Sequence, residues 1–121
     1  LTEEAARRIY RIRYIAEPGY DGIHNTTLRA LVVDAGVNHG TARATRLLQR
    51  AAGSKVDGIV GPNTLRATNE GHTTEIYFAF LRLRAEHYGQ LITEAPDQAR
   101  FAHGWMRRLG EFMRPPVAHD R

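Results

Sequence analysis

Residues 31–65, LVVDAGVNHGTARATRLLQRAAGSKVDGIVGPNTL, set the architecture of this chain. The apolar residues at the start of this stretch leave a helix no polar face, which predicts a buried helix over residues 28–37. The segment VNHG, residues 37–40, breaks this helix because Asn and Gly tolerate a positive φ. A second helix is expected over residues 42–52, with its apolar side chains inward and its arginines outward, and Gly53 ends it.

A compact loop, SKVDGIVG, follows at residues 54–61. Asp57 and Gly58 are a typical turn pair, and Pro62 suits the first position of another short helix. We therefore interpret the DG and GP pairs as structural residues that fix the loop. The loop also carries three apolar side chains that we expect to plug it onto the core: Val56, Ile59 and Val60.

The remaining segments also predict helices. Apolar residues recur at helical spacing over about residues 3–16, 74–92 and 96–114, and no segment shows strand alternation. In the second of these helices the buried stripe is expected to include Ile76, Phe80, Leu83 and Tyr88. The sequence thus predicts an all-α domain of about six helices over residues 1–114, followed by a disordered tail at residues 115–121.

Composition excludes several classes of protein. The chain has 121 residues, which suits one domain, and it has no cysteine, so disulfides and thiolate chemistry are excluded. No apolar run is long enough to span a bilayer, and the N-terminus has no signal-peptide core. The net charge of +4 comes almost entirely from arginine and favours polyanionic partners, either nucleic acid or an anionic cell wall.

Motifs for metal, cofactor or nucleotide chemistry are not found. The six histidines never lie within one helical turn of each other, so no local metal signature exists. The chain has no Walker loop and no GxGxxG motif, and nothing around its single serine, Ser54, resembles a nucleophile elbow. We expect no cofactor and no metal.

Asp34 interrupts the apolar run before the break. An unpaired carboxylate there would be costly, so Asp34 is either a structural ion pair or cap, or a carboxylate of raised pKa that lines a cleft. Glycoside hydrolysis needs carboxylates in a cleft, and Asp34 is the one acid in apolar surroundings. It is a weak candidate for a catalytic group, and composition and spacing alone do not establish an enzyme.

Two helices joined by a glycine turn also resemble a helix-turn-helix. In that interpretation the helix at residues 42–52 would enter the major groove, and Arg43, Arg46 and Arg50 would contact phosphates or guanine edges. Such patterns often arise by chance, because many helix pairs share a glycine turn.

A second interpretation uses DAGVNHG (residues 34–40), LLQ (47–49) and DGIVGPNTL (57–65) together. This order resembles the glycoside hydrolase family 108 lysozymes, cell-wall enzymes of phages and prophages with a predicted peptidoglycan-binding part at their C-terminal side. The segments EEAARRIYRIRY, RLRAEHYGQL and FAHGWMRRL are similar to that family too, so the resemblance covers nearly the whole chain. It implies a lysozyme-like helical domain, in which residues 41–70 form the peptidoglycan-binding-like element.

The resemblance does not supply a catalytic residue. The family's catalytic glutamate lies in an EGGY-type motif ahead of the matched residues, and this chain has no such motif. Its closest match, EPGY at residues 17–20, follows the first matched helix, and we interpret it as coincidental. The chain, which opens on Leu1, is therefore either a fragment without the catalytic segment or a degenerate relative.

The resemblance does imply a set of cleft-lining residues. Lysozyme-like folds place an Asn-x-Gly helix end at the floor of the sugar cleft, and Asn38 with Gly40 looks like that element. An amide suits the N-acetyl and hydroxyl groups of a glycan. Asp34 would face the same side, His39 could reach the rim, and Trp105 could stack on a sugar or serve as a core aromatic.

These features together predict a peptidoglycan-directed N-acetylmuramidase of the lysozyme or endolysin type, or its glycan-binding part. The partner would be the glycan strands of peptidoglycan, met at the bacterial cell wall or periplasm by a monomeric phage or prophage product. We expect neither a membrane nor nucleic acid as a partner. A non-catalytic wall-binding module, a DNA-binding protein and a structural role in a phage particle or secretion system remain the alternatives.

Overall fold

The computed structural model describes residues 1–114, and these residues are almost entirely helical. The predicted tail at residues 115–121 lies outside this part of the chain. No strand occurs within residues 1–114, so the prediction of an all-α fold is confirmed. The described part of the chain contains six α-helices: α1 (Glu3–Arg11), α2 (Thr26–His39), α3 (Thr41–Ala52), α4 (Pro62–Glu70), α5 (Thr73–Glu94) and α6 (Ala102–Glu111).

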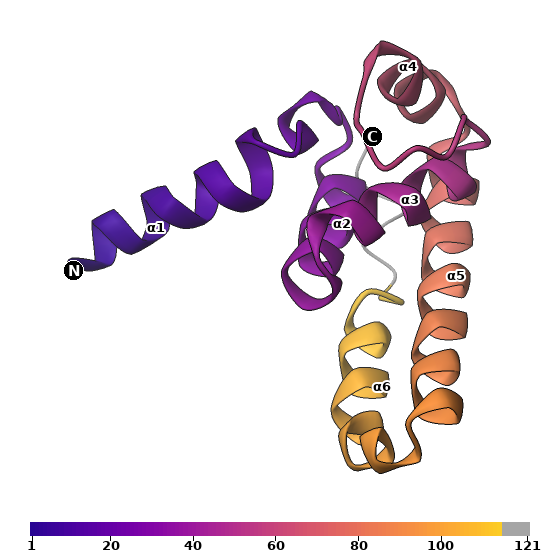
Figure 1. Ribbon diagram of the computed structural model, residues 1–121. Coiled ribbons are helices and arrows are strands. Elements are labelled where there is room, and N and C mark those ends of the chain that lie inside the picture. The colour runs from indigo at the N-terminus through magenta and orange to yellow at the C-terminus, as the bar shows by residue number, and fades with distance from the viewer. Residues whose placement is uncertain (115–121) are drawn as a thin grey trace.

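Helices α2 to α6 form the body of the molecule (Figure 1). Helix α2 packs against α3, and α3 packs against α5, the longest helix. A short 3₁₀ segment, Pro96–Phe101, then turns the chain so that α6 runs back beside α5. Helix α4 and the loop before it cover the outer end of α3 (Figure 1).

The core lies between α2, α3 and α5. Leu31, Val32 and Leu48 are fully buried, as the apolar stretch predicts. The predicted stripe on α5 is also confirmed, because each of its four members is buried: Ile76, Phe80, Leu83 and Tyr88. The turn before α2 adds Tyr20, which is fully buried and whose hydroxyl donates a hydrogen bond to the carbonyl of Thr41.

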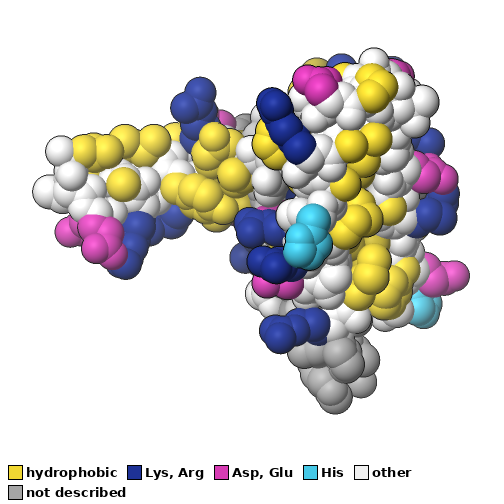
Figure 2. All heavy atoms as spheres, turned by 90° about the horizontal axis from the view of Figure 1, so that it is seen from below, with side chains coloured by type: hydrophobic (Ala, Val, Ile, Leu, Met, Phe, Trp, Pro, Cys, Tyr) yellow, Lys and Arg dark blue, Asp and Glu magenta, His cyan; other side chains and the backbone are white. Residues whose placement is uncertain are grey.

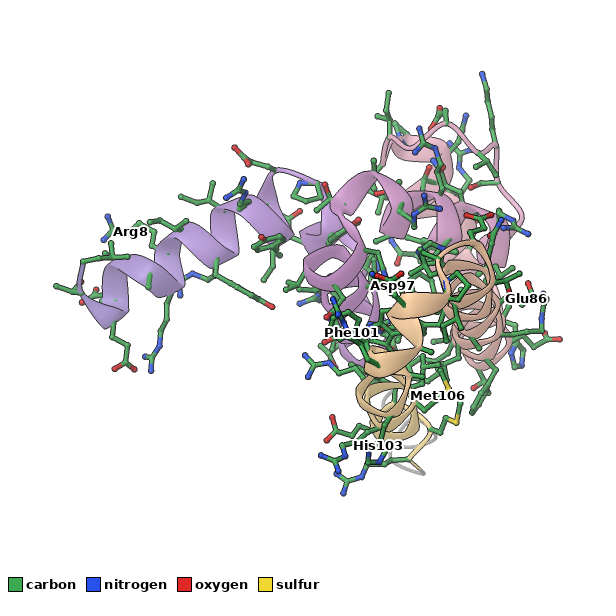
Figure 3. The ribbon with its side chains drawn as sticks, turned by 60° about the horizontal axis from the view of Figure 1, so that its bottom comes forward. Arg8, Glu86, Asp97, Phe101, His103 and Met106 are labelled. Atoms are coloured by element: carbon green, nitrogen blue, oxygen red, sulfur yellow. The ribbon has the colours of Figure 1, made fainter. Side chains whose placement is uncertain are left out.

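Helix α1 projects away from the body as an arm (Figure 1). It continues into a turn of π-helix at Ile12–Ala16, and none of its own residues is buried. Apolar side chains follow one side of the arm and charged side chains the other (Figure 2). Ile9 is therefore 51% exposed although it lies in the apolar stripe. In Figure 3, Arg8 lies on the arm far from the body.

The break between α2 and α3 is a single residue. Helix α2 continues through Asn38 and ends at His39, so the expected end at residue 37 is two residues early. Gly40 has φ +91 and connects the two helices directly. Because L-residues rarely adopt this conformation, a glycine is the natural residue for so short a turn. Gly53 has φ +77 at the end of α3, as predicted.

Candidate functional site

The side chain of Gln49 holds the loop at residues 54–61 in place. Gln49 lies on α3, is fully buried and takes part in five hydrogen bonds to the loop and to α4. Its Oε1 atom accepts from the backbone N–H groups of Asp57 and Gly58, both at 3.0 Å. Its Nε2 atom donates to the Asp57 carboxylate, the Ile59 carbonyl and the Thr64 hydroxyl. One amide thus binds polar groups of three consecutive loop residues and of the first turn of α4.

The turn residues support this arrangement from the other side. The Asp57 carboxylate also accepts the N–H of Ile59 at 3.0 Å. The pKa of Asp57 is lowered, first by this backbone hydrogen bond from Ile59 and then by the side-chain hydrogen bond from Gln49. Gly58 has φ +81, and a Cβ atom there would lie 3.2 Å from the guanidinium carbon of Arg46. The DG pair is therefore structural in this fold, which is the role predicted for it.

The prediction that three apolar side chains of the loop pack onto the core is wrong for two of them. Val60 is partly buried against the core, but Val56 is 46% exposed and Ile59 is 69% exposed. The reason is that Gln49, a polar side chain, occupies the space beneath the turn. The loop is anchored by hydrogen bonds, so its apolar side chains are left at the surface.

Asp34 connects three helices through two arginines. One carboxylate oxygen, Oδ1, accepts from Nε of Arg108 on α6 at 2.9 Å and lies 2.6 Å from Nη2 of the same residue. The other oxygen, Oδ2, forms an ion pair at 2.8 Å with Nη2 of Arg84 on α5, although the angle is outside hydrogen-bond geometry. Asp34 raises the pKa of Arg108 through this hydrogen bond and its charge. Of the two alternatives for Asp34, the structure shows an ion pair.

Arg84 is the centre of this cluster and is fully buried. Besides its ion pair with Asp34, it donates from Nε to Nε2 of His39 at 3.0 Å and from Nη2 to the Tyr88 hydroxyl at 3.1 Å. Its Nη1 atom is buried and has no hydrogen-bond partner within residues 1–114. A buried guanidinium is tolerated only where such partners replace water, and here they come from α2 and α5.

His39 serves in this cluster as a neutral acceptor. Burial, followed by the positive charge of Arg84, lowers the pKa of His39 to about 3. The ring can therefore accept a hydrogen bond from Arg84 at neutral pH. It also packs edge-on against Tyr88, with ring centres 4.9 Å apart. The neighbouring His87 has a lowered pKa too, chiefly because it is partly buried.

Trp105 extends the cluster along α6. Its ring stacks on Tyr88 with 4.8 Å between centres and an angle of 19° between planes. Phe101 lies 5.9 Å further on and is 43% exposed. Figure 3 places Phe101 and Met106 on the segment that leads into and along α6. Trp105 is thus half-buried, with one face against Tyr88, and its proposed contact with a sugar stays a prediction.

Asn38 and Gly40 lie beside the cluster but do not join it. The Asn38 side chain is exposed, and its amide nitrogen donates to the carbonyl of Asp34 in its own helix at 2.9 Å. A Cβ atom at Gly40 would meet nothing within 4 Å, so the space beside this turn is open. The structure therefore brings Asp34 and His39 into contact with Arg84, and Trp105 joins them through Tyr88, while Asn38 and Gly40 face outward at the helix end.

A groove of about 370 Å³ lies between the arm and α2. Asp34 and Arg29 supply its charged groups, while Tyr10, Val33 and Phe112 are among its apolar walls. The groove gives Asp34 the concave surroundings that a cleft-lining residue needs. Both of its oxygens are nevertheless engaged by guanidinium groups, so Asp34 lacks the free oxygen that a nucleophile or general acid requires. Within residues 1–114, no group of His, Asp and Glu could hold a metal ion.

Three residues of this site were not predicted from the sequence: Arg84, Arg108 and Gln49. Arg84 sits within the apolar stripe of α5, and a charged residue in a buried stripe is the signal that could have identified it. Gln49 carries a similar signal, because it follows two buried leucines on α3. Arg108 has no such signal, since it lies among exposed basic residues.

Comparison with known proteins gives matches along most of the chain. Residues 43–110 match the family described as "Predicted Peptidoglycan domain", and residues 1–40 match the family described as "Glycosyl hydrolase 108". A search of curated proteins finds no match. Within residues 1–114, no helix is both long and apolar enough to cross a membrane.

Among solved structures, the chain is similar to that of SagA from Brucella abortus. The two share 26% sequence identity, and the TM-score is 0.78 over 93% of this chain. The match spans 62% of the SagA chain. The lysozyme-like helical fold expected from the resemblance is therefore confirmed. With more than half of its length matched by one model, the chain belongs to the predicted peptidoglycan domain family, and its first 40 residues are of the glycosyl hydrolase 108 type.

Proposed function

We propose that this chain binds the glycan strands of bacterial peptidoglycan and forms the substrate-holding part of a cell-wall hydrolase of the muramidase type. The observation that carries the proposal is the junction of the two matched families at the turn between α2 and α3. These helices pack on each other as one body, and Asp34 links α2 to two helices of the peptidoglycan domain. A ligand held there would contact both parts.

The groove beside Asp34 has the mixed lining that supports sugar binding. Tyr10 and Phe112 offer apolar faces, while Arg29 and the outer edge of Asp34 offer polar groups. The exposed amide of Asn38, one turn beyond Asp34, adds a donor and acceptor near the same helix end. Aromatic faces combined with fixed polar groups are the usual means of binding a ring with many hydroxyls.

Hydrolysis requires a carboxylic acid at the glycosidic oxygen, and Asp34 is held by two arginines. We therefore infer that this chain binds peptidoglycan but hydrolyses it poorly without a glutamate supplied by a segment of the family's N-terminal type. In keeping with that role, we propose that it acts as a monomer at the cell wall or periplasm, comes from a phage or prophage, and does not bind nucleic acid.

Co-sedimentation with purified cell-wall sacculi tests the proposal. The chain should pellet with sacculi, and the turbidity of the suspension should stay close to that of a buffer control. Asn38→Ala should weaken pelleting, whereas Asn63→Ala, an exposed change on α4, should not. If the chain stays in the supernatant, the binding proposal is wrong. If turbidity falls at the rate given by an intact lysozyme, the inference of poor hydrolysis is wrong.

The helix-turn-helix alternative receives less support from the geometry. Arg43, Arg46 and Arg50 are exposed on α3, as predicted. The Arg46 guanidinium, however, packs against Gly58, so the loop at residues 54–61 occupies the space beside that face. A recognition helix needs such a face free to enter the major groove. A gel-shift titration with mixed duplex DNA at physiological salt should show no complex.

A further inference from the structure

A second pocket, of about 300 Å³, lies apart from the Asp34 cluster. Its walls come from three segments: residues 17–19 in the turn before α2, residues 41–45 at the start of α3, and residues 58–60 in the loop. The first segment belongs to the part of the chain that matches the hydrolase family, and the other two lie at or within the peptidoglycan domain. The pocket is thus a second place where both parts can contact one ligand.

The walls of this pocket are fixed by direct contacts. A Cβ atom at Gly19 would lie 3.3 Å from Cβ of Val60, so the turn packs directly on the loop. Behind them, the buried Tyr20 hydroxyl shares a hydrogen bond of 2.9 Å with the Thr45 hydroxyl and donates to the Thr41 carbonyl. Since Gln49 anchors the loop from below, the pocket is formed before any ligand arrives.

Ile59 presents an apolar side chain at the edge of this pocket. Its N–H donates to Asp57 and its carbonyl accepts from Gln49, so its backbone is held on both sides. Its side chain is nevertheless 69% exposed. Because its backbone is fixed, this apolar group stays at the rim of the pocket, where a ligand would contact it. Val60 continues the apolar surface into the pocket.

Two opposite charges flank the apolar surface. Glu17 lines one side of the pocket, while Arg46 lies outside its wall, with its guanidinium against Gly58, which does line it. The two side chains do not pair with each other, and neither forms an ion pair elsewhere within residues 1–114. The pocket therefore offers an acceptor for an ammonium group and an apolar wall for a small hydrocarbon group, and Arg46 beside it offers a donor for a carboxylate.

We propose that this pocket binds the peptide stem of peptidoglycan, with Glu17 facing an ammonium group of the peptide and Arg46 facing one of its carboxylates. Stem peptides carry such charges together with small methyl side chains, whereas the sugar rings are uncharged and gain little from opposite charges. A volume of about 300 Å³ suits one or two small residues. This inference rests on the proposed function and identifies a second chemical feature of the same polymer.

Isothermal titration of the full chain with the free tetrapeptide L-Ala-γ-D-Glu-L-Lys-D-Ala tests the proposal. Glu17→Gln and Arg46→Gln should each weaken binding about three- to tenfold, the range expected for one exposed charge-assisted contact. The matched controls are Glu4→Gln on the arm and Arg50→Gln one turn along α3, and these should leave the affinity unchanged. All four side chains are exposed, so the variants should fold normally.

The free tetrapeptide carries two ammonium groups, one on L-Ala and one on the lysine side chain, and acetylation of the lysine amine tests whether the second is the partner of Glu17. The acetylated peptide should bind the wild-type chain about three- to tenfold more weakly, but it should show no further loss with Glu17→Gln. A tetramer of N-acetylglucosamine, which has no peptide, should bind the wild-type chain and the Glu17→Gln variant with equal affinity.

Three outcomes would overturn the inference: no binding of the tetrapeptide, equal loss of affinity in the controls, or sugar binding that Glu17→Gln removes. Pelleting with sacculi separates the two proposals. A chain that pellets but does not bind the tetrapeptide retains the proposed function and refutes only the stem-peptide site. A chain that does neither refutes both.

Discussion

Gln49 is the single side chain on which the loop at residues 54–61 depends. Gln49→Ala removes five hydrogen bonds and leaves the N–H groups of Asp57 and Gly58, the carbonyl of Ile59 and the buried Thr64 hydroxyl without this partner. We expect the free energy of unfolding to fall by about 3 kcal/mol or more. Urea unfolding followed by circular dichroism measures this loss. Gln90→Ala, an exposed change on α5, should cost no more than about 0.5 kcal/mol.

Lys55 gives a local measurement of the same effect. It is the only lysine in the chain and lies exposed in this loop. Under native conditions a lysine-specific protease should cleave the Gln49→Ala variant at least about tenfold faster than the wild type, because the loop opens more often. Equal cleavage rates would show that the loop is held by contacts other than Gln49.

His39 makes stability depend on pH. Its pKa is lowered from 6.5 to about 3 in the folded chain, first by burial and then by Arg84. The unfolded chain binds the proton below about pH 6.5, whereas the folded chain does not do so until about pH 3. The contribution of neutral His39 to stability is therefore fully present above pH 6.5 and is lost as the pH falls toward 3.

His39→Gln tests this linkage, because glutamine can still accept a hydrogen bond from Arg84 but does not titrate. Between pH 6.5 and 4 the free energy of unfolding of the wild type should fall by about 1 to 3 kcal/mol more than that of the variant. Urea unfolding at a series of pH values measures the difference. His103→Gln, an exposed change on α6, should follow the wild-type profile. Parallel profiles for His39→Gln and wild type would contradict the assignment.

Helix packing depends on Arg84 more than on Arg108, although both contact Asp34. Arg84 is fully buried and links α5 to α2, whereas the Arg108 side chain is 49% exposed. Arg84→Met should cost about 3 kcal/mol, since it leaves His39 and Tyr88 without their donor. Arg108→Gln should cost about 1 kcal/mol or less, because a half-exposed ion pair contributes little.

Hydrogen exchange separates the two variants by location. Arg108→Gln should speed amide exchange in α6 alone, because Asp34 keeps its ion pair with Arg84. Arg84→Met should speed exchange in α2 and α5 as well. Arg107→Gln, a neighbouring exposed arginine without this ion pair, is the matched control and should change neither. If the amide exchange rates of α2, α5 and α6 are the same in all three variants, then Asp34 does not couple these helices.

The helices themselves were largely predictable from the sequence, whereas the side-chain contacts that join one helix to another were not. Caps and breakers act locally, so Asn25 begins α2, Gly53 ends α3 and Pro62 begins α4 as expected. The Asp34 cluster joins residues 50 and 74 positions apart in the chain, and helical periodicity contains no information about such pairs. For the same reason the position of Ile59 was mispredicted, because apolarity alone does not reveal that Gln49 fills the space below.

Seen as a whole, the molecule consists of a packed body and an arm that adds nothing to its core. No residue of α1 is buried, so removing residues 1–11 should change the free energy of unfolding by less than about 1 kcal/mol. The unfolding transition should remain a single step, because α2 to α6 keep all of their mutual contacts. Thermal unfolding followed by circular dichroism measures both properties.

Truncation at the other end of the described chain is the contrasting control. Ending the chain before α6, at residue 101, removes the buried Leu109 and the Arg108 side chain that contacts Asp34. It also uncovers the faces of Tyr77 and Tyr88 that α6 and the residues after it contact. The loss of one buried leucine alone costs about 2 to 5 kcal/mol, so this variant should unfold at a much lower temperature. If removal of the arm lowers the unfolding temperature equally, then the apolar stripe of the arm packs against the body in solution. The groove beside Asp34 is then narrower in solution than in this structure.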